Sequence, residues 1–133
     1  MQLTPQNFHK KYSKKTCVQK NHILHFGVSG LKVLESVRLT ETQIKTFEWV
    51  IKKILKNQKT GVKFWSKFNL NLTLTKLSLE SRMGKGKGNF EARAQFLKPG
   101  TVFFEFSELS HQLQKKISNN LIKIFPVKIK FIK

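Results

Sequence analysis

The residues with the clearest chemical potential form a short glycine- and lysine-rich segment, 82–89 (RMGKGKGN). Its three glycines stand at every second position, so the backbone can adopt positive φ angles and press closely against another surface. Bare backbone amides can bind phosphate oxygens, and Arg82, Lys85 and Lys87 add positive charge to the same loop. The segment therefore predicts phosphate binding. A flexible, solvated hairpin loop is the plainer interpretation of the same residues.

The glycine spacing does not fit the common nucleotide-binding loops. The P-loop pattern needs four residues between its glycines and then Gly-Lys-Ser/Thr, whereas Lys87 is followed by Gly88. The GxGxxG spacing of dinucleotide-binding folds also fails. We therefore expect no cofactor.

The whole chain is strongly basic. Its 133 residues carry 26 Lys and Arg against 7 acidic residues, a formal net charge of +19. So many like charges repel one another in the compact state, which favours a polyanionic partner that cancels them. Nucleic acid is the first candidate, and an anionic membrane surface is the second. The excess charge extends along the whole chain, which indicates anions on several sides of the protein.

Several classes of site are excluded or disfavoured by what the sequence lacks. All seven acidic residues are Glu, which excludes Asp-based triads, Asp dyads and Asp-rich calcium or magnesium sites. The four His and the single Cys17 show no metal-ligand spacing, and no Asp could orient a catalytic base, so neither a catalytic nor a metal site is expected. No apolar run approaches the ~20 residues of a transmembrane helix. The two amphipathic helices predicted below have a sheet to cover, which leaves no apolar face for lipid, and we expect no membrane partner.

The chain divides into an arm and a body. Residues 1–26 are predicted to form a basic N-terminal arm, and residues 27–133 a single globular RNA-binding domain with a Gly/Lys loop at 80–89. Twelve Phe residues and 39% hydrophobic residues are enough for a packed core, so the body is not a disordered polycation.

Two amphipathic helices and several short strands are expected in the body. Residues 40–43 (TETQ) form a capping box that starts a helix ending near Lys59. Ser107 is the expected cap of a second helix, which Pro126 stops. Alternating apolar residues predict strands over 31–39, 62–68, 70–74, 90–96, 102–106 and 127–131. The turn at residues 99–100 (PG) is expected to join two of them as a hairpin. Helices that cover one face of a mostly antiparallel sheet make the predicted fold α+β, a two-layer sandwich.

Motifs in a fixed order connect the chain to a known family. The segments are 26–32 (FGVSGLK), 38–44 (RLTETQI), 63–65 (KFW), 82–88 (RMGKGKG) with Arg93 after it, 97–105 (LKPGTVFFE) and 126–128 (PVK). Together they resemble the L-sixteen family of large-subunit ribosomal proteins, in its bacterial type, over almost the whole chain. The sequence departs from the family pattern in three places, one of which is Arg93, where the family often has an aromatic residue. Lysines replace the His-Lys-Gly-Arg run of the arm, and residues 69–79 lack the family's prolines.

The resemblance implies a structural constituent of the large ribosomal subunit and no enzyme activity. It implies binding to large-subunit rRNA and a part in shaping the aminoacyl-tRNA site near the peptidyl-transferase centre. The expected partners are that rRNA, aminoacyl-site tRNA and neighbouring ribosomal proteins. The residues expected to bind RNA are Lys10, Lys11, Lys14, Lys15, Arg38, Arg82, Met83, Gly84, Lys85, Gly86, Lys87 and Gly88. A non-ribosomal basic RNA-binding protein or RNA chaperone is the alternative function.

The codon-linked composition bears on location. Lys outnumbers Arg by 23 to 3, and Phe, Ile and Asn are abundant, which indicates an AT-rich coding genome. A mitochondrial ribosome is therefore the expected location, with a bacterial cytoplasm or a plastid as the alternative.

Overall fold

The computed structural model describes residues 21–57, 61–84 and 86–133. Over these ranges the elements follow one another as β1 (Ser29–Val33), β2 (Val37–Thr40), α1 (Glu41–Asn57), β3 (Phe64–Ser66), β4 (Leu72–Lys76), β5 (Asn89–Leu97), β6 (Val102–Phe106), α2 (His111–Ile124) and β7 (Ile129–Ile132). The α+β class predicted from the sequence is confirmed. The predicted arm, residues 1–26, lies outside the described part of the chain except for residues 21–26.

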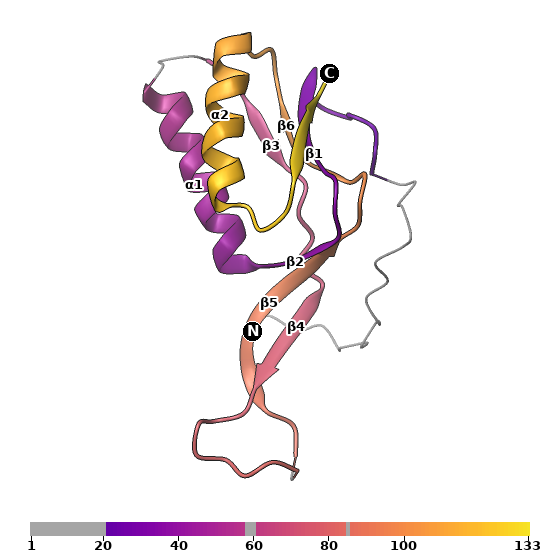
Figure 1. Ribbon diagram of the computed structural model, residues 1–133, viewed down its shortest axis with the longest axis vertical. Coiled ribbons are helices and arrows are strands. Elements are labelled where there is room, and N and C mark those ends of the chain that lie inside the picture. The colour runs from indigo at the N-terminus through magenta and orange to yellow at the C-terminus, as the bar shows by residue number, and fades with distance from the viewer. Residues whose placement is uncertain (1–20, 58–60, 85) are drawn as a thin grey trace.

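The described strands form two antiparallel sheets. The four-stranded sheet has the order β3-β6-β1-β7, and the three-stranded sheet has the order β2-β5-β4. Figure 1 shows α1 and α2 side by side next to the four-stranded sheet, while β4 and β5 run away from the helices. The arrangement separates a packed body from a projecting pair of strands.

The body is built around β6, whose residues are all buried. Leu31 of β1 lies opposite Phe104, and Lys32 lies opposite Val102, so Phe103 is the extra residue of a β-bulge. A bulge can turn two consecutive side chains toward the same side, and the rings of Phe103 and Phe104 lie 5.2 Å apart. Phe103 also stacks on Phe125 at 5.0 Å, just after α2. Simple alternation in the sequence would not have placed Phe103 in the core.

The capping box of α1 is confirmed. The backbone N–H of Thr40 donates to Oε1 of Gln43 at 3.0 Å, and the N–H of Gln43 lies 3.5 Å from Oγ1 of Thr40. Apolar residues at helical spacing turn one face of α1 into the core: Ile44, Phe47, Ile51, Ile54 and Leu55.

The second helix begins later than the sequence predicts. Ser107 was expected as its cap, but Ser110 occupies that position and accepts the N–H of Leu113 at 3.4 Å. The hydroxyl of Ser107 instead accepts the N–H of Lys63 at 3.0 Å, which extends the pairing of β3 with β6. The cap prediction was wrong because a tertiary hydrogen bond occupies Ser107. The expected stop before Pro126 is confirmed, since the helix ends at Ile124.

Two strand predictions were also wrong. Residues 31–39 do not form one strand: β1 and β2 belong to different sheets. The Pro99-Gly100 turn does not close a hairpin, because β5 pairs with β2 and β4, whereas β6 pairs with β1 and β3. Gly100 has a φ of 88°, as a turn glycine should, and its N–H donates to the Val33 carbonyl at 2.8 Å. The chain passes from one sheet to the other between β1 and β2 and again between β5 and β6. The Gly100–Val33 hydrogen bond joins the connection between β5 and β6 to the end of β1, so these two connections lie side by side.

Candidate nucleic-acid interface

The Gly/Lys loop lies at the tip of the projecting strands. Strands β4 and β5 pair from Leu72 opposite Ala94 to Lys76 opposite Asn89, and residues 77–88 connect them. In Figure 1 this connection is the part of the described chain farthest from the two helices. The loop is therefore presented to the surroundings by a pair of strands and is not packed on the core.

Two loop glycines have backbone conformations that favour glycine. The φ angle is 108° at Gly84 and 99° at Gly86, and a side chain is rarely compatible with either value. Gly88 has another role, since a Cβ atom there would lie 2.6 Å from the backbone carbon and oxygen of Lys76. The alternating glycines thus turn the chain at the tip and allow close backbone contact at the root.

The described side chains of the loop tip are exposed. Arg82 and Lys87 are exposed, Met83 keeps 94% of its surface, and Leu79 keeps all of it. Lys85 lies outside the described residues. No acidic residue occurs in residues 81–88, so positive charge at the tip has no carboxylate within that stretch. Exposed cations beside accessible backbone are what a phosphate group would need.

The structure does not gather all the predicted RNA-binding residues in one place. Arg82, Met83, Gly84, Gly86, Lys87 and Gly88 share the loop. Arg38 is exposed on β2, where it lies opposite Phe96 of β5 in the body. The four lysines predicted in the arm lie outside the described residues: Lys10, Lys11, Lys14 and Lys15.

A buried carboxylate that the sequence did not mark as functional organises the end of the arm. Glu105 of β6 has no exposed surface, and its oxygens accept the backbone N–H groups of His25, Phe26 and Gly27 at 2.6–3.1 Å. The Nζ atom of Lys67 lies 2.6 Å from Oε1 of the same carboxylate. The chain at the predicted boundary between arm and body is thereby tied to the central strand. A single acid within the apolar run VFFEF was the available signal in the sequence.

The surroundings of Glu105 decide its charge. Burial raises the pKa of a carboxyl group, but the Lys67 ammonium and the N–H groups of Phe26, Gly27 and His25 outweigh that effect and lower the pKa of Glu105 to about 2. Glu105 is therefore ionised at neutral pH and holds the three amides as an anion.

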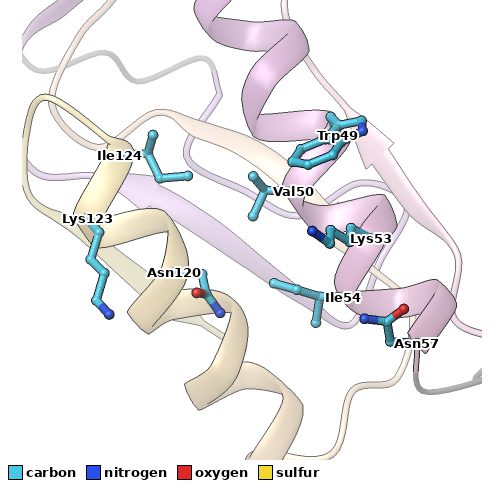
Figure 2. Close-up of a pocket in the computed structure, with 8 residues that line it drawn as sticks. All are labelled: Trp49, Val50, Lys53, Ile54, Asn57, Asn120, Lys123 and Ile124. Carbon is cyan, nitrogen blue, oxygen red and sulfur yellow. The ribbon is translucent and has the colours of Figure 1, made fainter.

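The helical layer carries a separate groove between α1 and α2, with a volume of about 360 Å³. Figure 2 shows Trp49, Val50 and Ile54 of α1 on one side and Ile124 of α2 on the other. The Nζ atom of Lys53 lies 5.0 Å from the centre of the Trp49 ring. None of the residues predicted to bind RNA lines this groove.

Two further properties of the described residues bear on other functions. No helix among them is long and apolar enough to cross a membrane. No group of His, Cys or Glu in residues 21–57, 61–84 and 86–133 is arranged to hold a metal ion. A nucleic-acid interface is what the described geometry supports best.

Sequence comparisons decide the family. The family model described as ribosomal protein L16p/L10e matches residues 4–132. The chain belongs to this family. L16p/L10e proteins are structural components of the ribosome and not enzymes, which confirms the expectation that the chain is not an enzyme.

Relatives within the L16p/L10e family come from several sources. The chain is 48% identical to the large ribosomal subunit protein uL16m of Chondrus crispus over 77% of each chain. It is 33% identical to the uL16 protein of Buchnera aphidicola over 98% of this chain and 96% of that one. The uL16c protein of Phaeodactylum tricornutum is 35% identical over 80% of this chain and 75% of the relative. The family resemblance drawn from the motifs is thereby confirmed.

Proposed function

We propose that this protein is a structural constituent of the large ribosomal subunit, where it binds large-subunit rRNA and helps to shape the aminoacyl-tRNA site near the peptidyl-transferase centre. Its relatives are named as large ribosomal subunit proteins, and one of them matches 98% of this chain. The observation that carries the proposal is the exposed Gly/Lys loop at the end of the projecting strands, with its acid-free stretch at residues 81–88.

The loop would act by neutralising phosphate. Arg82 can donate a bidentate pair of hydrogen bonds to a phosphate, and Lys87 supplies a more mobile point charge. Gly84 and Gly86 carry no side chain and have nothing within 4 Å of a built Cβ position, so backbone N–H groups can also reach phosphate oxygens. Such contacts position the protein on folded RNA through its shape, and few base contacts are required.

The body and the arm would supply further contacts. Arg38 lies on the exposed side of β2 and offers a second bidentate donor away from the loop. The arm lysines Lys10, Lys11, Lys14 and Lys15 are proposed to follow the RNA backbone. Neighbouring ribosomal proteins and aminoacyl-site tRNA complete the proposed partners.

We also propose a mitochondrial location. The high lysine-to-arginine ratio indicates an AT-rich genome, and the relative from Chondrus crispus carries the name uL16m. Fractionation of the source cells tests this directly: the protein should sediment with mitochondrial large subunits. Sedimentation with cytoplasmic or plastid ribosomes would contradict it.

The loop is tested by matched substitutions. Arg82→Ala should weaken translation by ribosomes that contain the variant, and Lys56→Ala should leave it near the wild-type level, because Lys56 is also exposed but lies on α1. Equal effects of the two variants would remove any special role for the loop. Absence of the protein from purified large subunits would overturn the ribosomal function itself.

A further inference from the structure

We propose that Phe26, stacked on Trp65, is a platform for one unpaired nucleobase of ribosomal RNA, an inference that rests on the RNA-binding function proposed above. The platform lies on the face of the four-stranded sheet that carries Glu105, since Trp65 of β3 pairs directly with Glu105 of β6. It is distinct from the Gly/Lys loop, which lies at the tip of the other sheet.

The geometry leaves one ring surface available. The ring centroids of Phe26 and Trp65 are 6.2 Å apart, with 27° between the ring planes, so the two rings are stacked. Trp65 is half-buried beneath this contact, whereas Phe26 keeps 64% of its surface exposed. Phe26 therefore contacts Trp65 and keeps most of its surface exposed, with the tilted ring of His25 6.4 Å away between centroids.

The backbone that carries Phe26 is held firmly. Its N–H donates to Oε2 of Glu105 at 2.6 Å, and the N–H groups of His25 and Gly27 donate to the same carboxylate. Gly27 lies so close to β6 that a Cβ atom there would be 2.2 Å from the carbonyl oxygen of Phe106. An exposed aromatic ring on a fixed backbone loses little conformational freedom on binding, which favours a stacking ligand.

The charges nearby favour RNA over an apolar protein segment as the ligand. Glu105, the acid beneath the platform, is fully buried and paired with Lys67. Lys63 lies two residues before Trp65 and is exposed. Its N–H donates to the Ser107 hydroxyl and its carbonyl accepts the Ser107 N–H, so Lys63 continues the extended geometry of β3. Residues two apart on an extended chain point to the same face, which places a cation beside the platform. A nucleotide would satisfy both features, because its base stacks on aromatic rings and its phosphate attracts lysine.

The test compares variants at Phe26 with one at Val28, an apolar neighbour of almost equal exposure at 63%. Full-length proteins are titrated with a transcript of the large-subunit rRNA of the source organism at several salt concentrations. Phe26→Leu should weaken binding about tenfold at every salt concentration, because base stacking is lost. The slope of log affinity against log salt should not change, since no phosphate contact is removed. Phe26→Trp should bind as the wild type does, and Val28→Ala should stay within about twofold.

Other outcomes would overturn the platform. If Phe26→Leu binds the transcript as tightly as the wild type, no base stacks on Phe26, although a steep salt dependence of the wild type would still support RNA binding. A wild type that fails to bind, or binds without salt dependence, would overturn the proposed function as well. If Phe26→Leu proves unstable in a denaturation control, a benzophenone amino acid at position 26 of assembled subunits replaces it. A crosslink to an rRNA nucleotide is expected there, and a crosslink only to protein would reject the platform.

Discussion

The Nζ atom of Lys67 lies 2.6 Å from Oε1 of Glu105, and the Glu105 side chain has no exposed surface while that of Lys67 keeps 13%. Lys67 follows β3 directly, and its own N–H donates to the carbonyl of Phe103 at 2.9 Å. The pair thus joins β3 to β6. The same carboxylate also holds three amides of residues 25–27, so one buried anion connects the start of the described chain with two strands.

Substitution of Glu105 should be strongly destabilising. Glu105→Gln removes the negative charge, leaves the Lys67 ammonium in a mostly buried place without its counter-ion, and directs an amide NH₂ toward backbone donors. We expect the free energy of unfolding to fall by about 3 kcal/mol, as when one partner of a buried ion pair is removed. Urea denaturation at neutral pH measures it. Glu91→Gln is the control, because the Glu91–Lys76 pair is exposed and 3.7 Å apart, and it should change stability by no more than about 0.5 kcal/mol.

The stability should depend on pH through Glu105. Its pKa is lowered from 4.5 to about 2 in the folded protein, so the carboxylate is charged in both states at neutral pH and its full stabilisation is present there. Between pH 4.5 and about 2 the unfolded chain takes up a proton that the folded protein does not, and stability falls by about 3 kcal/mol from this group. Urea titrations at a series of pH values should show this loss in the wild type. The loss should be smaller by that amount in Glu105→Gln, and identical curves would contradict the assignment.

Gly27 should tolerate no side chain. The Cβ atom of Gly27→Ala would lie 2.2 Å from the Phe106 carbonyl oxygen, which is backbone of the central strand and cannot move freely. The segment must then shift, and the hydrogen bonds to Glu105 loosen, so we expect a loss of about 2 kcal/mol or more. Gly61→Ala is the matched control, because nothing lies within 4 Å of a Cβ atom there. If the two variants have the same denaturation midpoint, residues 25–27 do not lie against β6 as described.

The loop cations should contribute to the salt dependence of RNA binding. Each phosphate that a cation neutralises adds ~0.7–0.9 to the slope of log affinity against log salt. Arg82→Ala should therefore lower the slope for the rRNA transcript by about that amount, and Lys56→Ala should leave it unchanged. Filter binding at a series of salt concentrations measures both. A slope that Arg82→Ala does not alter would show that Arg82 contacts no phosphate.

The contrast between Arg82→Ala and Phe26→Leu separates two kinds of contact. The first variant should change the salt slope, because a phosphate contact is lost. The second should lower affinity without changing the slope, because only stacking is lost. Together they distinguish the electrostatic part of RNA binding from the aromatic part on one protein and one transcript.

Features that depend on neighbours in the chain could be predicted from the sequence. The capping box at residues 40–43, the apolar face of α1, the end of α2 before Pro126 and the glycine turns at Gly84 and Gly86 all agree with the structure. Each depends on hydrogen bonds or side-chain spacing within a few residues, and the local sequence pattern predicts both. The net charge and the acid-free stretch at residues 81–88 are likewise properties of the sequence.

Features that depend on distant contacts were decided by the tertiary structure. The cap of α2 moved from Ser107 to Ser110 because Lys63, 44 residues away, bonds to the Ser107 hydroxyl. The Pro99-Gly100 turn leads from one sheet to the other because β5, before it, pairs with β2, whereas β6, after it, pairs with β1. No local sequence pattern distinguishes that turn from a hairpin turn. Glu105 holds amides 78–80 residues earlier in the chain. Such contacts follow from how the sheets pack, since a buried charge finds its partners only when the strands that carry them have come together.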